Sequence, residues 1–339
     1  MPQRQIVDIH AHLFPRNMPD LAERTGDDRW PTLVVDGSEA KVYRCGIPVR
    51  KAGRTLWDVA ARIAALDAAG VDRQVVSPVP VTLVDWADPE LTIAWTRAQN
   101  ELLAEAVAGS GGRLVGLGAV PLPQLDKTPD AAVAEAARIV GELGLAGIEL
   151  PTLPAGREFD DPFLRPFWAA VEQLRIPVFV HPTDGAGAIR RSGQPYEFGI
   201  GMLTDTAMAA TALVFGGVLD RYPGLRIALA HGCGALPWAF PRIRLMAAAA
   251  NGTTPERADA LLRTLWADAL VFDPEHLRLL GTRFGAGHLM LGTDDPIVPG
   301  QLTAAPAMVR EAVASGVISA ADADGVLGAN ALDFLARNP

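Results

Sequence analysis

Short runs of apolar and β-branched residues recur along the chain, and most are followed by a segment with apolar residues at three- and four-residue spacing. Near-continuous apolar runs predict parallel strands covered on both faces. The three- and four-residue spacing predicts helices, as over residues 56–69 and 130–143. The predicted strands cover residues 6–9, 73–77, 114–120, 147–150, 177–180, 226–230, 269–272 and 289–292.

The repeated alternation of strand and helix predicts a closed (β/α)8 TIM barrel of the α/β class. The Gly-x-Gly-x-x-Gly pattern that would favour an open nucleotide-binding sheet does not follow the first predicted strand. Residues 13–55 interrupt the alternation with Pro, Gly and a few alternating apolar residues. We therefore predict one barrel domain over residues 1–339, with residues 13–55 as an insertion or lid over the barrel mouth.

The composition favours a large core and a small-molecule partner. Of 339 residues, 49% are hydrophobic and the net charge is −9, without any Lys/Arg-rich run. This balance disfavours nucleic acid and anionic membranes as partners. No apolar run reaches the ~18 residues of a membrane span, and the first residues lack the apolar core of a signal peptide. Cys45 and Cys233 cannot form a disulfide framework, so we expect a cytoplasmic protein.

Four of the six histidines lie at the ends of predicted strands: His10 and His12 at the first, His181 at the fifth and His231 at the sixth. Asp294 follows the eighth. The carboxyl ends of barrel strands converge on the face where active sites lie. His10 and His12 are two residues apart, so both imidazoles point to one side of a strand. A lone His-x-His is more typical of ordinary hydrogen-bonded histidines, but the joint placement predicts a divalent metal site.

The number and type of metal ions follow from the same residues. A set of three of these imidazoles and the Asp294 carboxylate would suit zinc first and manganese second. Dinuclear hydrolases of this barrel type often carry a bridging Lys at the end of the fourth strand, where this chain has Gly-Ile-Glu-Leu-Pro. We therefore predict one ion per chain. Glu149 could be a further ligand, although a structural carboxylate is the interpretation that we favour.

Several motifs together resemble one enzyme family. They are Ile-Val-Asp-Ile-His-Ala-His-Leu-Phe-Pro at 6–15, Val-Phe-Val-His-Pro at 178–182, Ala-His-Gly-Cys-Gly at 230–234 and Met-Leu-Gly-Thr-Asp-Asp-Pro at 290–296. The chain resembles the amidohydrolase-related metal-dependent decarboxylases nearly from end to end. The resemblance implies that His10, His12, His181 and Asp294 hold the metal. It also implies that His231 stays off the metal and acts as acid/base.

The reaction that the resemblance implies is non-oxidative decarboxylation of an unsaturated or aromatic carboxylic acid. Hydroxide could add to the substrate before CO2 leaves, or an acid could protonate the reacting carbon directly, and the sequence favours neither route. His231 and Asp294 are the candidate proton carriers. The alternative is a metal-dependent hydrolase or hydratase that acts on a carboxylated lactone or alkene.

Two arginines also match the family. The resemblance implies that Arg50 grips a substrate carboxylate and that Arg242 reaches the site of a neighbouring subunit, which makes a homodimer the working unit. A guanidinium presents a planar fork that suits a carboxylate, whereas most surface arginines form only weak ion pairs.

Three positions depart from the family pattern. Thr183, and a position near Pro195, stand where relatives carry tryptophans that line the substrate pocket, so we expect a different pocket. Asp295 stands where a Tyr is familiar. It either adds negative charge near the metal or caps the following loop.

Overall fold

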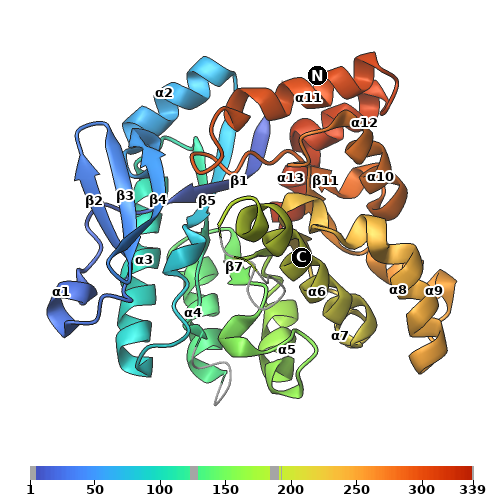
Figure 1. The fold of residues 1–339 in the computed structure, drawn as a ribbon, viewed down its shortest axis with the longest axis horizontal. Helices are drawn as coiled ribbons and strands as arrows, with labels where there is room; N and C mark the ends of the chain where they lie inside the picture. Colours follow the sequence, from blue (N-terminus) through green and yellow to red (C-terminus); the bar gives the residue numbers. More distant parts are fainter. Residues whose placement is uncertain (1–4, 123–128, 184–190, 192, 338–339) are drawn as a thin grey trace.

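The fold is that of a closed barrel wrapped by helices (Figure 1). The computed structural model describes residues 5–122, 129–183, 191 and 193–337. Within these ranges eight parallel strands form one sheet in the order β1-β5-β6-β7-β8-β9-β10-β11. Hydrogen bonds from Ile9 N to Leu291 O (2.8 Å) and from Asp294 N to His10 O (2.7 Å) join β1 to the segment that includes β11. The predicted (β/α)8 barrel is confirmed.

Seven of the eight predicted strands overlap observed ones. The barrel strands are β1 (Val7–Leu13), β5 (Arg73–Pro78), β6 (Leu114–Gly118), β7 (Gly147–Pro151), β8 (Val178–His181), β9 (Ile227–Leu229), β10 (Trp266–Asp268) and β11 (Leu289–Met290). The prediction of a strand over residues 269–272 is wrong, because β10 ends at Asp268. There the chain turns: Leu270 N donates to the Asp268 carboxylate at 3.1 Å, and Phe272 has a φ of 59°. Residues 269–272 are apolar like a strand, so the pattern could not separate the two.

The helices lie mainly on the outside of the barrel. They are α2 (Val59–Ala69), α3 (Pro89–Ala108), α4 (Asp130–Gly141), α5 (Arg165–Gln173), α6 (Met202–Phe215), α7 (Val218–Arg221), α8 (Leu236–Asn251), α9 (Pro255–Leu262), α10 (Pro274–Phe284), α11 (Gln301–Ala314), α12 (Ala320–Asp324) and α13 (Asn330–Leu335). Two of them, α2 and α4, match the predicted helices. Capping side chains define where several helices begin. Asp58, for example, accepts a hydrogen bond from Ala61 N at the N-terminus of α2.

Residues 13–55, predicted as an insertion, fold into a small antiparallel sheet beside the barrel (Figure 1). It contains α1 (Leu21–Thr25), β2 (Thr32–Asp36), β3 (Glu39–Arg44) and β4 (Ile47–Gly53). Trp30 and Val42 are buried in a cluster with Trp95 of α3, which ties the sheet to the barrel wall. The sheet is therefore packed in place, and β4 brings Arg50 and Lys51 to the cavity at the barrel mouth.

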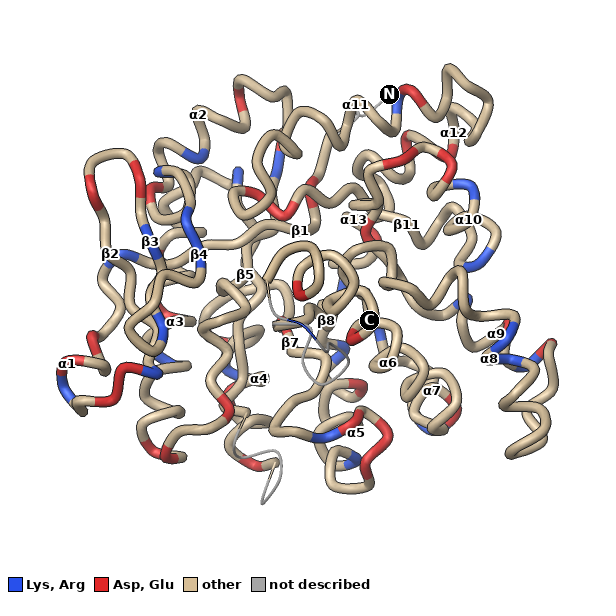
Figure 2. The backbone as a smooth tube through the Cα atoms, viewed as in Figure 1, with Lys and Arg blue, Asp and Glu red and all other residues tan. Residues whose placement is uncertain are grey.

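One helical segment of the described chain, Tyr196–Phe215, is long and apolar enough to cross a membrane by length and composition alone. It contains Glu197 and Asp205, so it is not an uninterrupted apolar run. Ala209 and Leu213 of this segment are buried in the core, as in the core helices of soluble proteins, which pass the same test. Charged residues of both signs are interspersed over the outer helices (Figure 2).

Candidate metal centre

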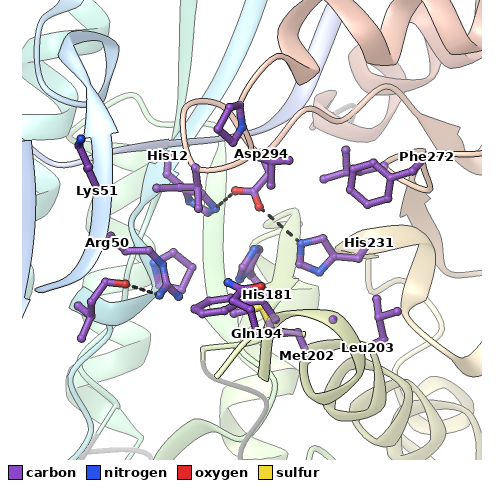
Figure 3. A pocket seen from close by; sticks show the side chains of 18 residues that line it. His12, Arg50, Lys51, His181, Gln194, Met202, Leu203, His231, Phe272 and Asp294 are labelled. Carbon is purple, nitrogen blue, oxygen red and sulfur yellow. Dashed lines mark hydrogen bonds and ion pairs between the residues drawn. The ribbon is translucent and has the colours of Figure 1, made fainter. Parts of the chain in front are cut away.

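The five side chains predicted to meet do converge at the carboxyl end of the barrel. Figure 3 shows four of them, His12, His181, His231 and Asp294. The ring centroids of His10, His12 and His181 lie 4.9–5.2 Å from one another, and that of His231 lies 4.9 Å from His181. Asp294 Oδ1 lies 3.1 Å from His12 Nε2 and 3.7 Å from His10 Nε2. Strands far apart in sequence thus bring four imidazoles and one carboxylate around one point.

The three imidazoles assigned to the metal share one arrangement. Each places Nδ1 against an acceptor: Asp268 Oδ2 at 2.6 Å for His10, Pro78 O at 3.0 Å for His12 and Pro182 O at 2.6 Å for His181. An acceptor at Nδ1 holds a proton on that nitrogen and turns Nε2 toward the site. The three Nε2 atoms and Asp294 Oδ1 are buried and make no hydrogen bond within the described ranges.

These buried atoms fit a divalent ion. Leaving a buried polar atom without a partner costs about 1–3 kcal/mol, and four of them meet here. Three imidazole nitrogens and a carboxylate oxygen are the donor set of catalytic zinc and related ions. The chemistry of the donors and their shared direction therefore agree with the metal site predicted from the sequence.

The electrostatics of the cluster are strongly perturbed. Burial opposes protonation of His10, but the hydrogen bond to Asp268 and the charge of Asp294 raise its pKa to about 9. Burial lowers the pKa of His12 and His181. Burial acts to raise the pKa of Asp294, yet the nearby imidazoles of His12, His231 and His10 hold it well below its ordinary value. Asp294 is therefore a carboxylate, as a metal ligand must be.

His231 belongs to the cluster but differs from the other three histidines. Its Nδ1 has no hydrogen-bond partner in the described part of the chain, and its Nε2 lies 3.8 Å from Asp294 Oδ2. The ligand atoms of His10, His181, His231 and Asp294 lie within 4.8 Å of one another, so distance alone also allows His231 to bind the ion. The anchored Nδ1 of His12 favours His12 as the ligand. His231 then remains the acid/base candidate.

Glu149, in the middle of β7, is buried near the same cluster. Neither of its oxygens has a hydrogen-bond partner of normal geometry among the described residues, and burial raises its pKa well above the ordinary value. One oxygen lies within 4.8 Å of ligand atoms of His12 and His181. The structure thus places Glu149 close enough to be a further ligand, and the structural role that we favoured stays a prediction.

Asp295 has a role that neither sequence interpretation named. Its carboxylate pairs with Arg62 of α2, whose Nη1 lies 3.2 Å from Asp295 Oδ2. Arg62 is fully buried and also donates to His12 O and to Gln74 Oε1, each at 2.5 Å. The negative charge of Asp295 is therefore balanced by a buried cation.

A cavity of about 660 Å³ lies above the cluster. Much of its wall is apolar, and the apolar residues are Val49, Pro80, Phe198, Met202, Leu203, Leu270, Phe272, Ile297, Val298 and Pro299. Arg50 lines the cavity, with Cζ 4.2 Å from the centroid of the Phe198 ring, and its role in gripping a substrate carboxylate stays a prediction. Figure 3 shows Arg50 and Phe272 on opposite sides of His12, His181, His231 and Asp294. The cavity therefore offers a largely apolar space that adjoins the cluster and has a guanidinium in its wall.

Three sequence-selected residues lie outside this cavity. Arg242 is exposed on α8 and does not line it, so the structure of one chain does not bring Arg242 to its own site. Thr183 lines a neighbouring cavity of about 200 Å³. Pro195 is exposed. The neighbour of Pro195, Gln194, lines the main cavity instead.

Comparison with known proteins agrees with this geometry. The family model described as amidohydrolase matches residues 7–337. The chain belongs to the amidohydrolase family. The 2-amino-3-carboxymuconate-6-semialdehyde decarboxylase of Dictyostelium discoideum is 32% identical over 98% of this chain and 92% of its own length. The resemblance to metal-dependent decarboxylases of this family is thus confirmed.

Other relatives of this amidohydrolase carry further names. The 5-carboxyvanillate decarboxylase of Sphingomonas paucimobilis superposes with a TM-score of 0.80 at 23% identity, over 98% of this chain and 99% of that one. A dihydroxybenzoic acid decarboxylase of Polaromonas, solved with bound manganese, superposes at 0.72 with 21% identity over 98% and 97% of the two chains. A 2-keto-4-carboxy-3-hexenedioate hydratase of Sphingobium is 26% identical over 66% of this chain and 65% of its own.

Two buried residues of this amidohydrolase site escaped the sequence reasoning, Asp268 and Arg62. Asp268 ends a three-residue strand that the pattern placed three residues too late. Arg62 lies on an otherwise ordinary amphipathic helix, and its partner Asp295 is 233 residues away. A charged residue on the buried face of a helix was the one signal that could have identified Arg62.

Proposed function

We propose that this protein is a metal-dependent enzyme that removes CO2 non-oxidatively from an unsaturated or aromatic carboxylic acid. The observation that carries the proposal is the set of three buried Nε2 atoms and Asp294 Oδ1, which share one centre beneath an apolar cavity. Relatives named as decarboxylases support the reaction type. The activity is that of a carbon–carbon lyase.

On this proposal His10, His12, His181 and Asp294 hold one divalent ion per chain. A bound ion would supply stabilisation of the negative charge that develops on the substrate as CO2 leaves. The donor set suits zinc first, and manganese is the alternative supported by the manganese-bound relative. Elemental analysis of metal-loaded protein should give about one ion per chain. Two tightly held ions would contradict this stoichiometry.

The residues of the chain supply binding and proton transfer. Arg50 presents its guanidinium to the cavity and grips a substrate carboxylate. The apolar wall excludes water around the reacting carbon. His231 carries the proton, because its ring reaches the cavity and its two nitrogens are not both committed to protein partners. Asp294 Oδ2, 3.8 Å from His231 Nε2, orients the ring for that transfer.

We further propose that the working unit is a homodimer in the cytoplasm, formed through α8. On this helix Trp238 is 82% exposed and Leu245 is 64% exposed, on either side of Arg242 along the chain. Exposed large apolar residues in a cluster are typical of an interface. A partner subunit on this face would contact Arg242, which does not line the cavity of its own chain. The small sheet that carries Arg50 would act as the lid of each site.

The second candidate is a hydratase or hydrolase on the same scaffold, which the hydratase relative supports. Both reactions need the metal and an acid/base, so metal content does not separate them. A screen of carboxylated aromatics and ring-cleavage acids against metal-loaded protein does. CO2 release supports the decarboxylase, whereas substrate consumption without CO2 supports the hydratase or hydrolase.

A further inference from the structure

Asp268 is a buried carboxylate that the proposed reaction does not use directly. It ends β10 and is fully buried. Its Oδ2 lies 2.6 Å from His10 Nδ1. Its Oδ1 accepts from Gly232 N at 2.9 Å and from Leu270 N at 3.1 Å. Both oxygens are therefore committed, one to a candidate metal ligand and one to the backbone of two turns.

The His10 contact differs in kind from the contacts of the other two candidate ligands. His12 and His181 place Nδ1 against neutral backbone carbonyls, whereas His10 places it against a carboxylate. A carboxylate acceptor raises the basicity of an imidazole ligand and fixes its tautomer. Among the described histidines of the cluster, the ligand strength of His10 thus depends most directly on a side chain.

The second contact reaches the turn that carries His231. His231, Gly232 and Cys233 all have φ between 57° and 65°, a run of left-handed residues that is costly outside glycine. Asp268 Oδ1 binds the amide in the middle of this turn. A turn with such strained backbone angles is maintained only by interactions with neighbouring residues. The hydrogen bond from Gly232 N to Asp268 is one of these interactions.

The packing leaves room for this carboxylate and little more. A Cβ at Gly292 would lie 2.8 Å from Asp268 Cβ and 3.2 Å from Asp268 Oδ2. Because residue 292 is a glycine, the Asp268 side chain has room to contact both His10 and the amide of Gly232.

We propose that Asp268 is a positioning residue that couples the two halves of the site: it orients His10 as a metal ligand and holds the turn that presents His231. This inference rests on the proposed metal site. Asp268→Asn separates the two contacts, because the amide oxygen can still accept from Gly232 N. The amide NH2 would face His10 Nδ1 as a donor. It would favour the tautomer with the proton on Nε2, where the ion should bind.

The test measures binding of Zn²⁺ and Mn²⁺ to the purified, chelator-stripped full chain, by competition with a chromophoric chelator. Asp268→Asn should weaken metal binding by about 10- to 100-fold, the range for loss of such a partner. Asp268→Ala should weaken it at least as much. Asp273→Asn is the matched control: it makes the same change at an exposed helix cap near the same strand end, and binding should stay at the wild-type value.

Hydrogen exchange of the peptide that contains Gly232 reports the second contact. Exchange should accelerate at least about tenfold in Asp268→Ala and stay near wild type in Asp268→Asn, since only the alanine removes the acceptor. If a variant at 268 does not fold, Gly292→Ala replaces it, because the new Cβ would displace the carboxylate and should also weaken metal binding.

The outcomes separate this inference from the proposed function. Wild-type protein that binds neither ion would overturn the metal site itself. Wild-type protein that binds metal, alongside 268 and 292 variants with unchanged affinity and unchanged exchange, would leave the metal site standing and overturn the role of Asp268.

Discussion

Replacing Arg62 with methionine should strongly destabilise the fold, because this arginine is fully buried and binds three acceptors. Its Nη2 donates to His12 O and its Nη1 to Gln74 Oε1, while Asp295 Oδ2 lies 3.2 Å from Nη1. A methionine side chain is of similar length but has no hydrogen-bond donor. The substitution leaves a largely buried carboxylate without its cation, together with two unsatisfied oxygens.

The expected loss of stability follows from the ion pair between Arg62 and Asp295. Removing one partner of a buried ion pair costs about 3–5 kcal/mol. Two orphaned oxygens act in the same direction without adding fully, since all three acceptors belong to one network. We therefore expect the free energy of unfolding to fall by about 3–5 kcal/mol, measured by urea denaturation of metal-free protein with far-UV circular dichroism.

Two further variants serve as controls for this prediction. Arg54→Met breaks the exposed pair with Asp58 and should cost less than about 1 kcal/mol. The double variant Arg62→Met/Asp295→Asn should cost less than the sum of its two single variants, because no lone charge remains buried. A loss below about 1 kcal/mol for Arg62→Met would refute the reasoning.

Three further predictions concern the site and its assembly. His231→Ala should keep its metal and lose about 100- to 10,000-fold in rate; loss of the metal would make His231 a ligand. In the folded protein a thiol reagent should modify the exposed Cys45 and spare Cys233, since burial raises the pKa of that thiol; two reactive thiols before unfolding would contradict this. Mixing His231→Ala and Arg242→Ala subunits should restore roughly a quarter of wild-type activity if Arg242 acts across a two-fold dimer, and none if it acts within its own chain.

The convergence of the proposed metal ligands could be predicted from the sequence, because the topology of a barrel brings the carboxyl ends of its strands to one face. His181 and Asp294 are 113 positions apart in the sequence, but each follows a strand whose carboxyl end must face the same way. The pair His10 and His12 needed only the two-residue period of a strand. That a residue follows an apolar strand pattern is a local property of the sequence, so it can be identified without knowledge of the rest of the fold.

The supporting residues could not be predicted in the same way. Asp268 depends on where β10 ends, and strand ends are the part of a pattern that hydrophobicity defines least. The partners of Arg62 lie on β1, on β5 and after β11, so its role exists only once the barrel closes. Arg242 does not line the cavity of its own chain, and the role proposed for it involves a second chain, which no pattern within one sequence specifies.

The most direct test of the proposed function follows the carboxyl carbon itself. Metal-loaded protein is incubated with carboxyl-¹³C-labelled aromatic and ring-cleavage acids, and labelled CO2 is measured by mass spectrometry. We predict labelled CO2 from at least one acid, its loss after chelation or in His12→Ala, and its return in the chelated wild type when zinc or manganese is restored. Conversion of an acid with the label retained in the product would contradict the decarboxylase and leave the hydratase or hydrolase.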